Sequence, residues 1–167
     1  MAETSADVEH LLEVCRRIEF TLASLYRFLS NLYGDIPDIA AVFLKTANEE
    51  ENHALQFVHA LKLPNVIEHP TAAAGSEDYL LRDVLDLDAK VRRTPPPPVD
   101  ALRTAVDLER RLAGYHMDTI GVFRQPRLQE MFKAMMAADK DHVETLTAAL
   151  AKLSPPSDGR VGSKVRG

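Results

Sequence analysis

Apolar residues recur every three or four positions along four long segments of this chain, a spacing that predicts four amphipathic helices. The segments cover about residues 5–33, 37–63, 99–123 and 126–153. Glycine and proline separate the first two segments, and a proline opens the fourth. No stretch shows the apolar–polar alternation of a strand. We therefore predict an all-α fold, a four-helix bundle made of two antiparallel helical hairpins.

The stretch between the second and third segments, residues 64–98, is less regular. Apolar positions from Leu80 to Val91 predict a short helix, which the prolines at 95–98 end. The connection is long enough to cross the length of a bundle, and a simple up-down arrangement also fits. We place the bundle in residues 1–153, with this connection inside it, and expect the Pro/Gly-rich basic tail at 154–167 to lie outside the core.

The composition narrows the class of protein. With 167 residues the chain suits one domain, and a net charge of −5 gives no reason to expect binding to nucleic acid. Cys15 is the only cysteine, which excludes an internal disulfide, and its position on an apolar stripe predicts a buried thiol. We see no signal peptide and no run of ~18 apolar residues that could span a membrane. We expect a cytoplasmic protein that does not bind a membrane.

Each half of the chain carries a lone glutamate, followed 30 or 31 residues later by an acidic residue and a histidine three positions apart. All six residues fall on the apolar stripes of predicted helices, where an unpaired charge costs several kcal/mol. They are Glu19, Glu50 and His53 in the first half and Glu109, Asp139 and His142 in the second.

The spacing of these residues predicts that they meet. In an antiparallel hairpin, residues equidistant from the turn lie level with one another, and the midpoint of each glutamate–acid pair falls in a predicted turn, at 34–35 and at 124. Residues i and i+3 share a helix face, so each acid and its histidine point inward. Four carboxylates in one core repel each other unless divalent cations neutralise them. We expect a two-metal site; a metal-free polar core is the alternative.

The order Glu, ExxH, Glu, [E/D]xxH over four helices resembles the rubrerythrin-type branch of the ferritin-like di-iron proteins. The resemblance covers about residues 5–153 and implies a ferritin-like four-helix bundle with a long crossover connection. It implies that Glu50 and Asp139 bridge two irons, that Glu19 and Glu109 are terminal ligands, and that the two histidines each bind one metal. Manganese is an alternative to iron, and zinc could occupy the site adventitiously.

The chain departs from the family pattern in three places. Position 139 is Asp where the family has Glu, and its shorter side chain puts the second bridge in doubt. Ala105 and Val106 stand where rubrerythrins carry an additional glutamate one turn before the third-helix ligand. No CxxC pairs of a rubredoxin domain follow the bundle, so the resemblance implies an external electron donor protein.

Two further residues repeat between the halves: Tyr26 lies seven positions after Glu19, and His116 lies seven positions after Glu109. Both should face the core two turns from the metals. They are either a hydrogen-bonded buried aromatic ring and imidazole, or residues that orient a metal ligand or relay a proton. We expect Glu49 and Glu51, which flank Glu50, to point to solvent.

From the resemblance, we expect a non-haem di-iron or di-manganese oxidoreductase that reacts with hydrogen peroxide or dioxygen. Ferritin-like oxidation and storage of Fe(II), hydroxylation of an organic substrate and a purely structural bundle are the alternatives. We expect a homo-oligomer, with a dimer favoured for peroxide reduction. The tail at 154–167 loosely resembles peptides that dock cargo proteins inside bacterial nanocompartments; a plain disordered tail is the other interpretation.

Overall fold

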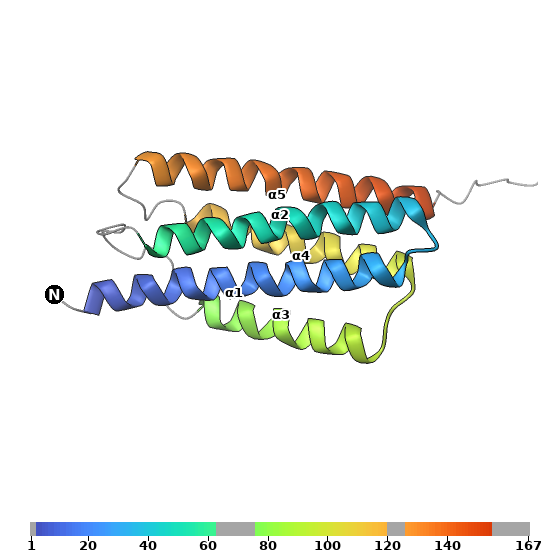
Figure 1. The fold of residues 1–167 in the computed structure, drawn as a ribbon, viewed down its shortest axis with the longest axis horizontal. Helices are drawn as coiled ribbons and strands as arrows, with labels where there is room; N and C mark the ends of the chain where they lie inside the picture. Colours follow the sequence, from blue (N-terminus) through green and yellow to red (C-terminus); the bar gives the residue numbers. More distant parts are fainter. Residues whose placement is uncertain (1–2, 63–75, 120–125, 155–167) are drawn as a thin grey trace, which may run out of the picture.

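The computed structural model describes residues 3–62, 76–119 and 126–154, which form five α-helices and, within these ranges, no strand (Figure 1). The helices are α1 (Glu3–Leu32), α2 (Pro37–Leu61), α3 (Ser76–Arg93), α4 (Pro98–Thr119) and α5 (Pro126–Leu153). The predicted all-α bundle is confirmed. The tail at 155–167 and the turn expected at 124 lie outside the described residues.

The four long helices lie side by side, and α3 runs along the outside of α1 (Figure 1). Helix α1 is antiparallel to α2, and α4 is antiparallel to α5. Because α3 runs back along the length of the bundle, α2 and α4 run in the same direction, so the simple up-down arrangement is not adopted.

The first hairpin turns where the sequence predicts. After α1 ends, the amide of Ile36 donates to the carbonyl of Tyr33 at 2.9 Å, and Pro37 opens α2 without needing a hydrogen-bond partner for its nitrogen. The hydroxyl of Tyr33 donates to the carbonyl of Pro96 at 2.6 Å. This bond ties the first turn to the segment between α3 and α4.

Helix α3 is longer than the short helix predicted around Leu80–Val91. Its additional first turn contains Glu77 and Asp78, and its last turn contains Lys90 and two arginines. The helix dipole stabilises acidic residues at the start of a helix and basic residues at its end. This stabilisation explains why α3 extends into sequence that contains few apolar residues. No helix among the described residues is long and apolar enough to cross a membrane.

Two apolar clusters fill the core, one toward each end of the bundle. On α2, Ala47 belongs to the larger cluster and Phe57 to the smaller one; on α5, Leu146 belongs to the larger and Met135 to the smaller. Cys15 is buried in the smaller cluster, as predicted. The acid-x-x-His pairs therefore lie between the two clusters, in a polar layer across the middle of the core.

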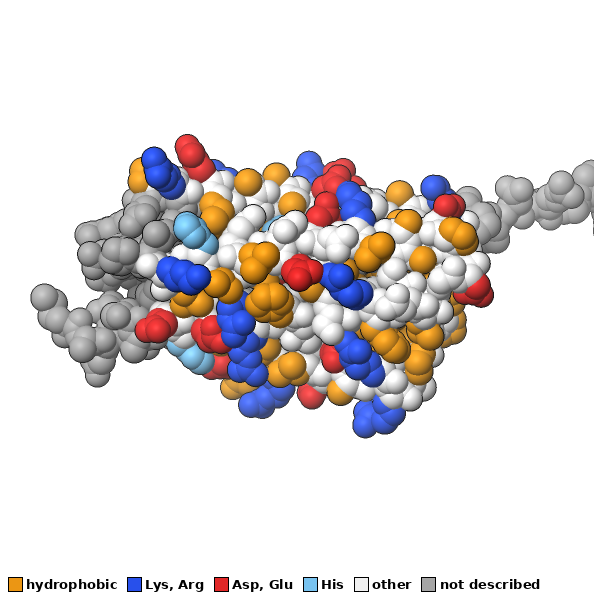
Figure 2. Space-filling model, viewed as in Figure 1, with side chains coloured by type: hydrophobic (Ala, Val, Ile, Leu, Met, Phe, Trp, Pro, Cys, Tyr) orange, Lys and Arg blue, Asp and Glu red, His pale blue; other side chains and the backbone are white. Residues whose placement is uncertain are grey.

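Charged side chains of both signs are interspersed over the outer face of α1, α2 and α3 (Figure 2). The buried carboxylates are thus not the continuation of a uniformly acidic surface on this face.

Candidate metal centre

All six predicted ligands are buried in the polar layer, and each has at most 3% of its surface exposed. Each of the four long helices contributes: α1 and α4 supply one glutamate each, and α2 and α5 supply one acid and one histidine each. The i, i+3 spacing places the acid and the histidine of each pair on the inward face of the helix. The predicted convergence of the two halves is confirmed.

Five of the six residues form two groups whose ligand atoms lie within 4.8 Å of one another and could hold a metal ion. One group consists of Glu19, Glu50 and His53; the other consists of Glu50, Glu109 and His142. Glu50 belongs to both groups, which is the position of a carboxylate that bridges two metals. Oxygen and imidazole ligands in this number suit divalent iron, manganese or zinc.

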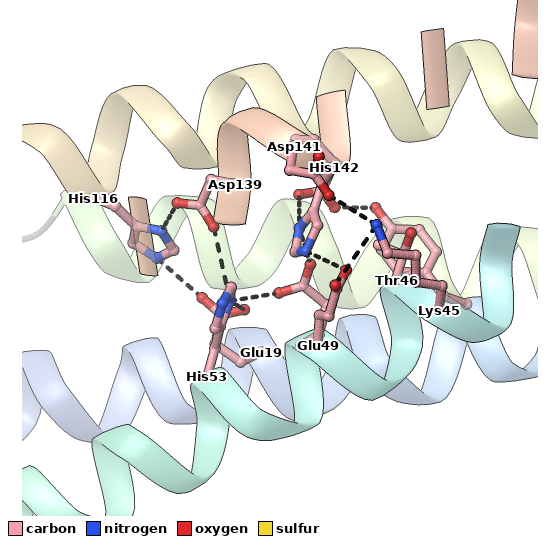
Figure 3. Close-up of polar contacts among 12 residues, drawn as sticks. Glu19, Lys45, Thr46, Glu49, His53, His116, Asp139, Asp141 and His142 are labelled. Carbon is pink, nitrogen blue, oxygen red and sulfur yellow. Dashed lines mark hydrogen bonds and ion pairs between the residues drawn. The ribbon is translucent and has the colours of Figure 1, made fainter. Parts of the chain in front are cut away.

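Asp139 lies beside these groups but belongs to neither of them. Its Oδ2 accepts a hydrogen bond from Nδ1 of His116 at 2.7 Å, and its Oδ1 lies 3.7 Å from Nδ1 of His53 (Figure 3). The side chain therefore lies on the side of the first group, with one oxygen held by His116. A bridging role for Asp139, which the family resemblance implies, has no counterpart in this arrangement.

Several ligand atoms in the layer have no hydrogen-bond partner although they are fully buried: both carboxylate oxygens of Glu19, Oε1 of Glu50 and both ring nitrogens of His142. Some of them lie close to an opposite group, such as Nδ1 of His142 at 2.9 Å from Oε1 of Glu50, but the pairs are not aligned as hydrogen bonds. Unsatisfied buried lone pairs are costly and rare in proteins. The residues fit a metal centre, because bound cations would satisfy these atoms.

The buried glutamates affect one another's ionisation through burial and charge. Burial, followed by the charge of Glu50, raises the pKa of Glu19 well above its ordinary value and that of Glu109 to about 7. Burial also opposes ionisation of Glu50, but the close contact with His142 and the hydrogen bond with His53 outweigh it and lower the pKa of this carboxyl. Among these three glutamates, the surroundings favour the charged form of Glu50 and the neutral forms of Glu19 and Glu109.

The imidazoles respond in the opposite direction. Burial disfavours the charged form of His116, but contacts with Asp139 and Glu19 raise its pKa to about 10. Burial likewise opposes protonation of His142, but contacts with Glu109 and Glu50 raise its pKa to about 11. Without metal, protons on these two rings balance the buried carboxylates. Metal binding must displace the proton from a ligating nitrogen.

Tyr26 and His116 both reach across the bundle to the lone glutamate of the other half. The hydroxyl of Tyr26 donates to Oε1 of Glu109, and Nε2 of His116 lies 3.0 Å from Oε1 of Glu19. Both side chains are buried. They thus contact candidate ligands directly instead of lying two turns away. Both interpretations of these residues, a hydrogen-bonded buried ring and a residue that orients a metal ligand, predict such contacts.

The prediction that Glu49 points to solvent is wrong. Its side chain is 30% exposed, and Oε2 lies 2.8 Å from Nε2 of His142 (Figure 3). Lys45 of α2 lies 3.8 Å from the other oxygen of Glu49 and 2.8 Å from Asp141. Glu49 therefore connects the buried histidine to charged residues at the surface. Its neighbour Glu51 pairs with Arg27 at 2.6 Å and is half-exposed, as predicted.

Three basic residues close in sequence to Glu109 and Asp139 pair outside the layer. Arg110 lies 4.0 Å from Asp107, Arg111 lies 2.7 Å from Asp83, and Lys140 lies 3.9 Å from Glu144. These three cations do not neutralise the buried carboxylates, as the helical spacing predicts.

Comparison with models of protein families, with curated proteins and with solved structures finds no match to this chain. The fold and the site alone define the class: an all-helical bundle with buried carboxylate and histidine groups that could hold metal ions.

Proposed function

We propose that this protein is a non-haem di-iron oxidoreductase, similar to rubrerythrin, that reacts with hydrogen peroxide or dioxygen and receives electrons from an external donor protein. The observation that carries the proposal is the pair of ligand groups that share Glu50. A shared carboxylate sets two cations side by side, which is the arrangement that a two-electron reaction with an O–O bond needs. Manganese is the alternative metal.

The chain holds the metals through residues of all four long helices. Glu19, Glu50 and His53 would bind one ion, with Oδ1 of Asp139 nearby, and Glu50, Glu109 and His142 would bind the other. When bound, two Fe(II) ions supply one electron each, which together with two protons reduce hydrogen peroxide to two water molecules or dioxygen to hydrogen peroxide.

The remaining residues of the layer position ligands and hold protons. Tyr26 donates to Glu109 and so fixes which carboxylate oxygen of Glu109 is free. His116 contacts both Glu19 and Asp139, and its Nδ1 hydrogen restrains the Asp139 carboxylate. Burial of the layer excludes bulk water from the ligands.

The test begins with metal analysis of the purified protein, where about two Fe or Mn ions per chain are expected for a bundle of this kind. The Fe(II)-loaded protein is then mixed with hydrogen peroxide and, separately, with dioxygen, and the remaining Fe(II) is quenched with a chelator over time. We expect oxidation faster than that of free Fe(II) in the same buffer with at least one oxidant. Oxidation no faster than free iron with both would overturn the proposal.

A matched pair of variants links the result to the site. Glu50→Gln removes the shared carboxylate, and Glu51→Gln makes the same chemical change on the next residue, which faces solvent. We expect Glu50→Gln to abolish the fast oxidation and Glu51→Gln to preserve it. Ferritin-like storage is distinguished by oligomeric state, since a large shell favours storage and a dimer favours peroxide reduction.

A further inference from the structure

A small apolar cavity lies beside Tyr26, between α1, α3 and α4. Its volume is about 10 Å³, and its lining includes Tyr26, Leu87, Ala105 and Leu108. This is comparable with the ~10–15 Å³ that one water-sized molecule requires and far below the ~150 Å³ of a cavity that holds benzene. The cavity has room for one small molecule and no room for an organic substrate.

The cavity extends from the surface toward the polar layer. Thr104 at its outer side is exposed, and Leu87 and Pro96 are half-buried. Ala105 and Tyr26 at its inner side are buried, and the hydroxyl of Tyr26 donates to Glu109. One side chain therefore separates the cavity from a candidate metal ligand.

The Thr104 hydroxyl lies at the exposed outer side of the cavity, and the rest of the lining offers few hydrogen-bond partners to a molecule inside. The Tyr26 hydroxyl is committed to Glu109, and the carbonyl of Pro96 accepts from Tyr33. Hydrogen peroxide would lose its hydrogen bonds to water on entering such a space, which disfavours its entry. Dioxygen has no hydrogen bonds to lose, and apolar cavities bind apolar guests.

We propose that this cavity admits dioxygen to the metal centre and excludes peroxide from this side, with Ala105 keeping the passage open and Tyr26 standing at its inner end. This inference names the oxidant that reaches the metal centre by this route, so its consequence for catalysis rests on the proposed function. The presence of the gas in the cavity is independent of any metal.

The first test needs no metal. Methyl resonances of the iron-free protein are recorded under nitrogen and under pressurised dioxygen, which is paramagnetic and broadens nearby signals. Leu25 and Leu108 line the cavity, whereas Leu12 and Leu146 are equally buried elsewhere in the core. We expect severalfold greater broadening at Leu25 and Leu108, lost in Ala105→Leu. Equal broadening of all four residues in the wild type would overturn the proposal.

The second test uses Fe(II)-loaded protein and both oxidants. We expect Ala105→Leu to slow oxidation by dioxygen by roughly tenfold, which corresponds to a rise of ~1.4 kcal/mol in the activation free energy. Oxidation by peroxide should stay unchanged. Ala149→Leu adds the same volume at a buried position of α5 that does not line the cavity and should change neither rate. Leu87→Phe, at the half-buried outer side, plugs the passage if Ala105→Leu fails to fold.

The outcomes separate the two proposals. If wild-type protein oxidises Fe(II) with neither oxidant, the proposed function fails, while the broadening test still decides whether dioxygen enters the cavity. If oxidation is fast but Ala105→Leu and Leu87→Phe leave the ratio of the two rates unchanged, the function stands and the route is wrong.

Discussion

Tyr26 of α1 donates its hydroxyl hydrogen to Glu109 of α4, and in the mirror-related contact His116 of α4, ninety positions after Tyr26, reaches Glu19 of α1. Each half of the chain thus supplies the residue that positions the lone glutamate of the other half. The two positioning residues differ in how many partners they can hold. A phenol has one hydrogen to donate, whereas an imidazole has two ring nitrogens. His116 uses its second nitrogen to hold Asp139.

Removal of the Tyr26 hydroxyl should weaken metal binding. In Tyr26→Phe, the buried Glu109 carboxylate loses a donor that favours its charged form, so its pKa should rise further. We expect metal affinity to fall by about 10–100-fold, the usual effect of losing a partner of a ligand. Competition with a chelating dye measures the affinity. Tyr33→Phe, which removes the bond to Pro96, should leave it unchanged; an equal loss in both variants would contradict this role of Tyr26.

Replacement of Asp139 should affect one metal position more than the other. Asp139 lies on the side of His53 and outside both ligand groups, so Asp139→Asn should weaken one of two binding steps, whereas Glu50→Gln should weaken both. Calorimetric titration with Mn(II) resolves the steps. Asp141→Asn alters a surface residue that pairs with Lys45 and serves as the control. Equal weakening of both steps by Asp139→Asn would show that this residue bridges.

Glu49 should tune the metal bound by His142. Its carboxylate lies at Nε2, and in a metal-bound state it would accept the hydrogen of that nitrogen and direct Nδ1 to the metal. In Glu49→Gln, we expect a loss of roughly tenfold in affinity at one position. Glu51→Gln, one residue further, should have no effect. Identical titrations of the two variants would rule out the role.

The metal-free protein should lose stability as pH rises. The pKa of Glu109 is raised from 4.5 to about 7, and the pKa values of His116 and His142 are raised from 6.5 to about 10 and about 11. A group with a raised folded-state pKa stabilises the fold fully below its unfolded pKa, and this contribution disappears as pH rises through the folded value. Stability should therefore fall from pH 4.5 to 7 through Glu109 and from pH 6.5 to about 11 through the histidines.

Metal should reverse this dependence. Ligands must be deprotonated to bind, so the metal-loaded protein should gain stability from mildly acidic to neutral pH, where the metal-free protein loses it. Urea unfolding across this range, with and without a chelator, measures both trends. Parallel pH profiles for the two forms would show that the buried groups do not bind the metal.

The helices and the meeting of the candidate ligands within the first hairpin could be predicted from the sequence because both depend on local spacing. A stripe of apolar residues sets which face of α2 is buried, and Glu50 and His53 fall on it. The described turn between α1 and α2 fixes the level of one helix against the other, so Glu19 meets Glu50 and His53 whatever the position of the second hairpin.

The contacts between hairpins could not be predicted in the same way. Glu49 sits at the edge of the apolar stripe, where a short side chain faces solvent and a long one can turn inward to a partner on another helix. His142 is that partner, and it belongs to α5. The contact between His116 and Glu19 likewise depends on how closely α4 approaches α1. The sequence contains one indication of the contact between Glu49 and His142. Glu49 is charged, whereas Ala138 holds the equivalent place beside the acid-x-x-His pair of the second half.

The polar layer separates a larger apolar cluster from a smaller one that contains Leu11, Phe57 and Phe132. A core divided in this way can open at one end while the other end stays folded. A cation held by residues of all four long helices would join the two ends into one cooperative unit. The supply of metal would then decide whether the chain unfolds in one step or in two, and whether its smaller end is exposed to proteases when that metal is scarce.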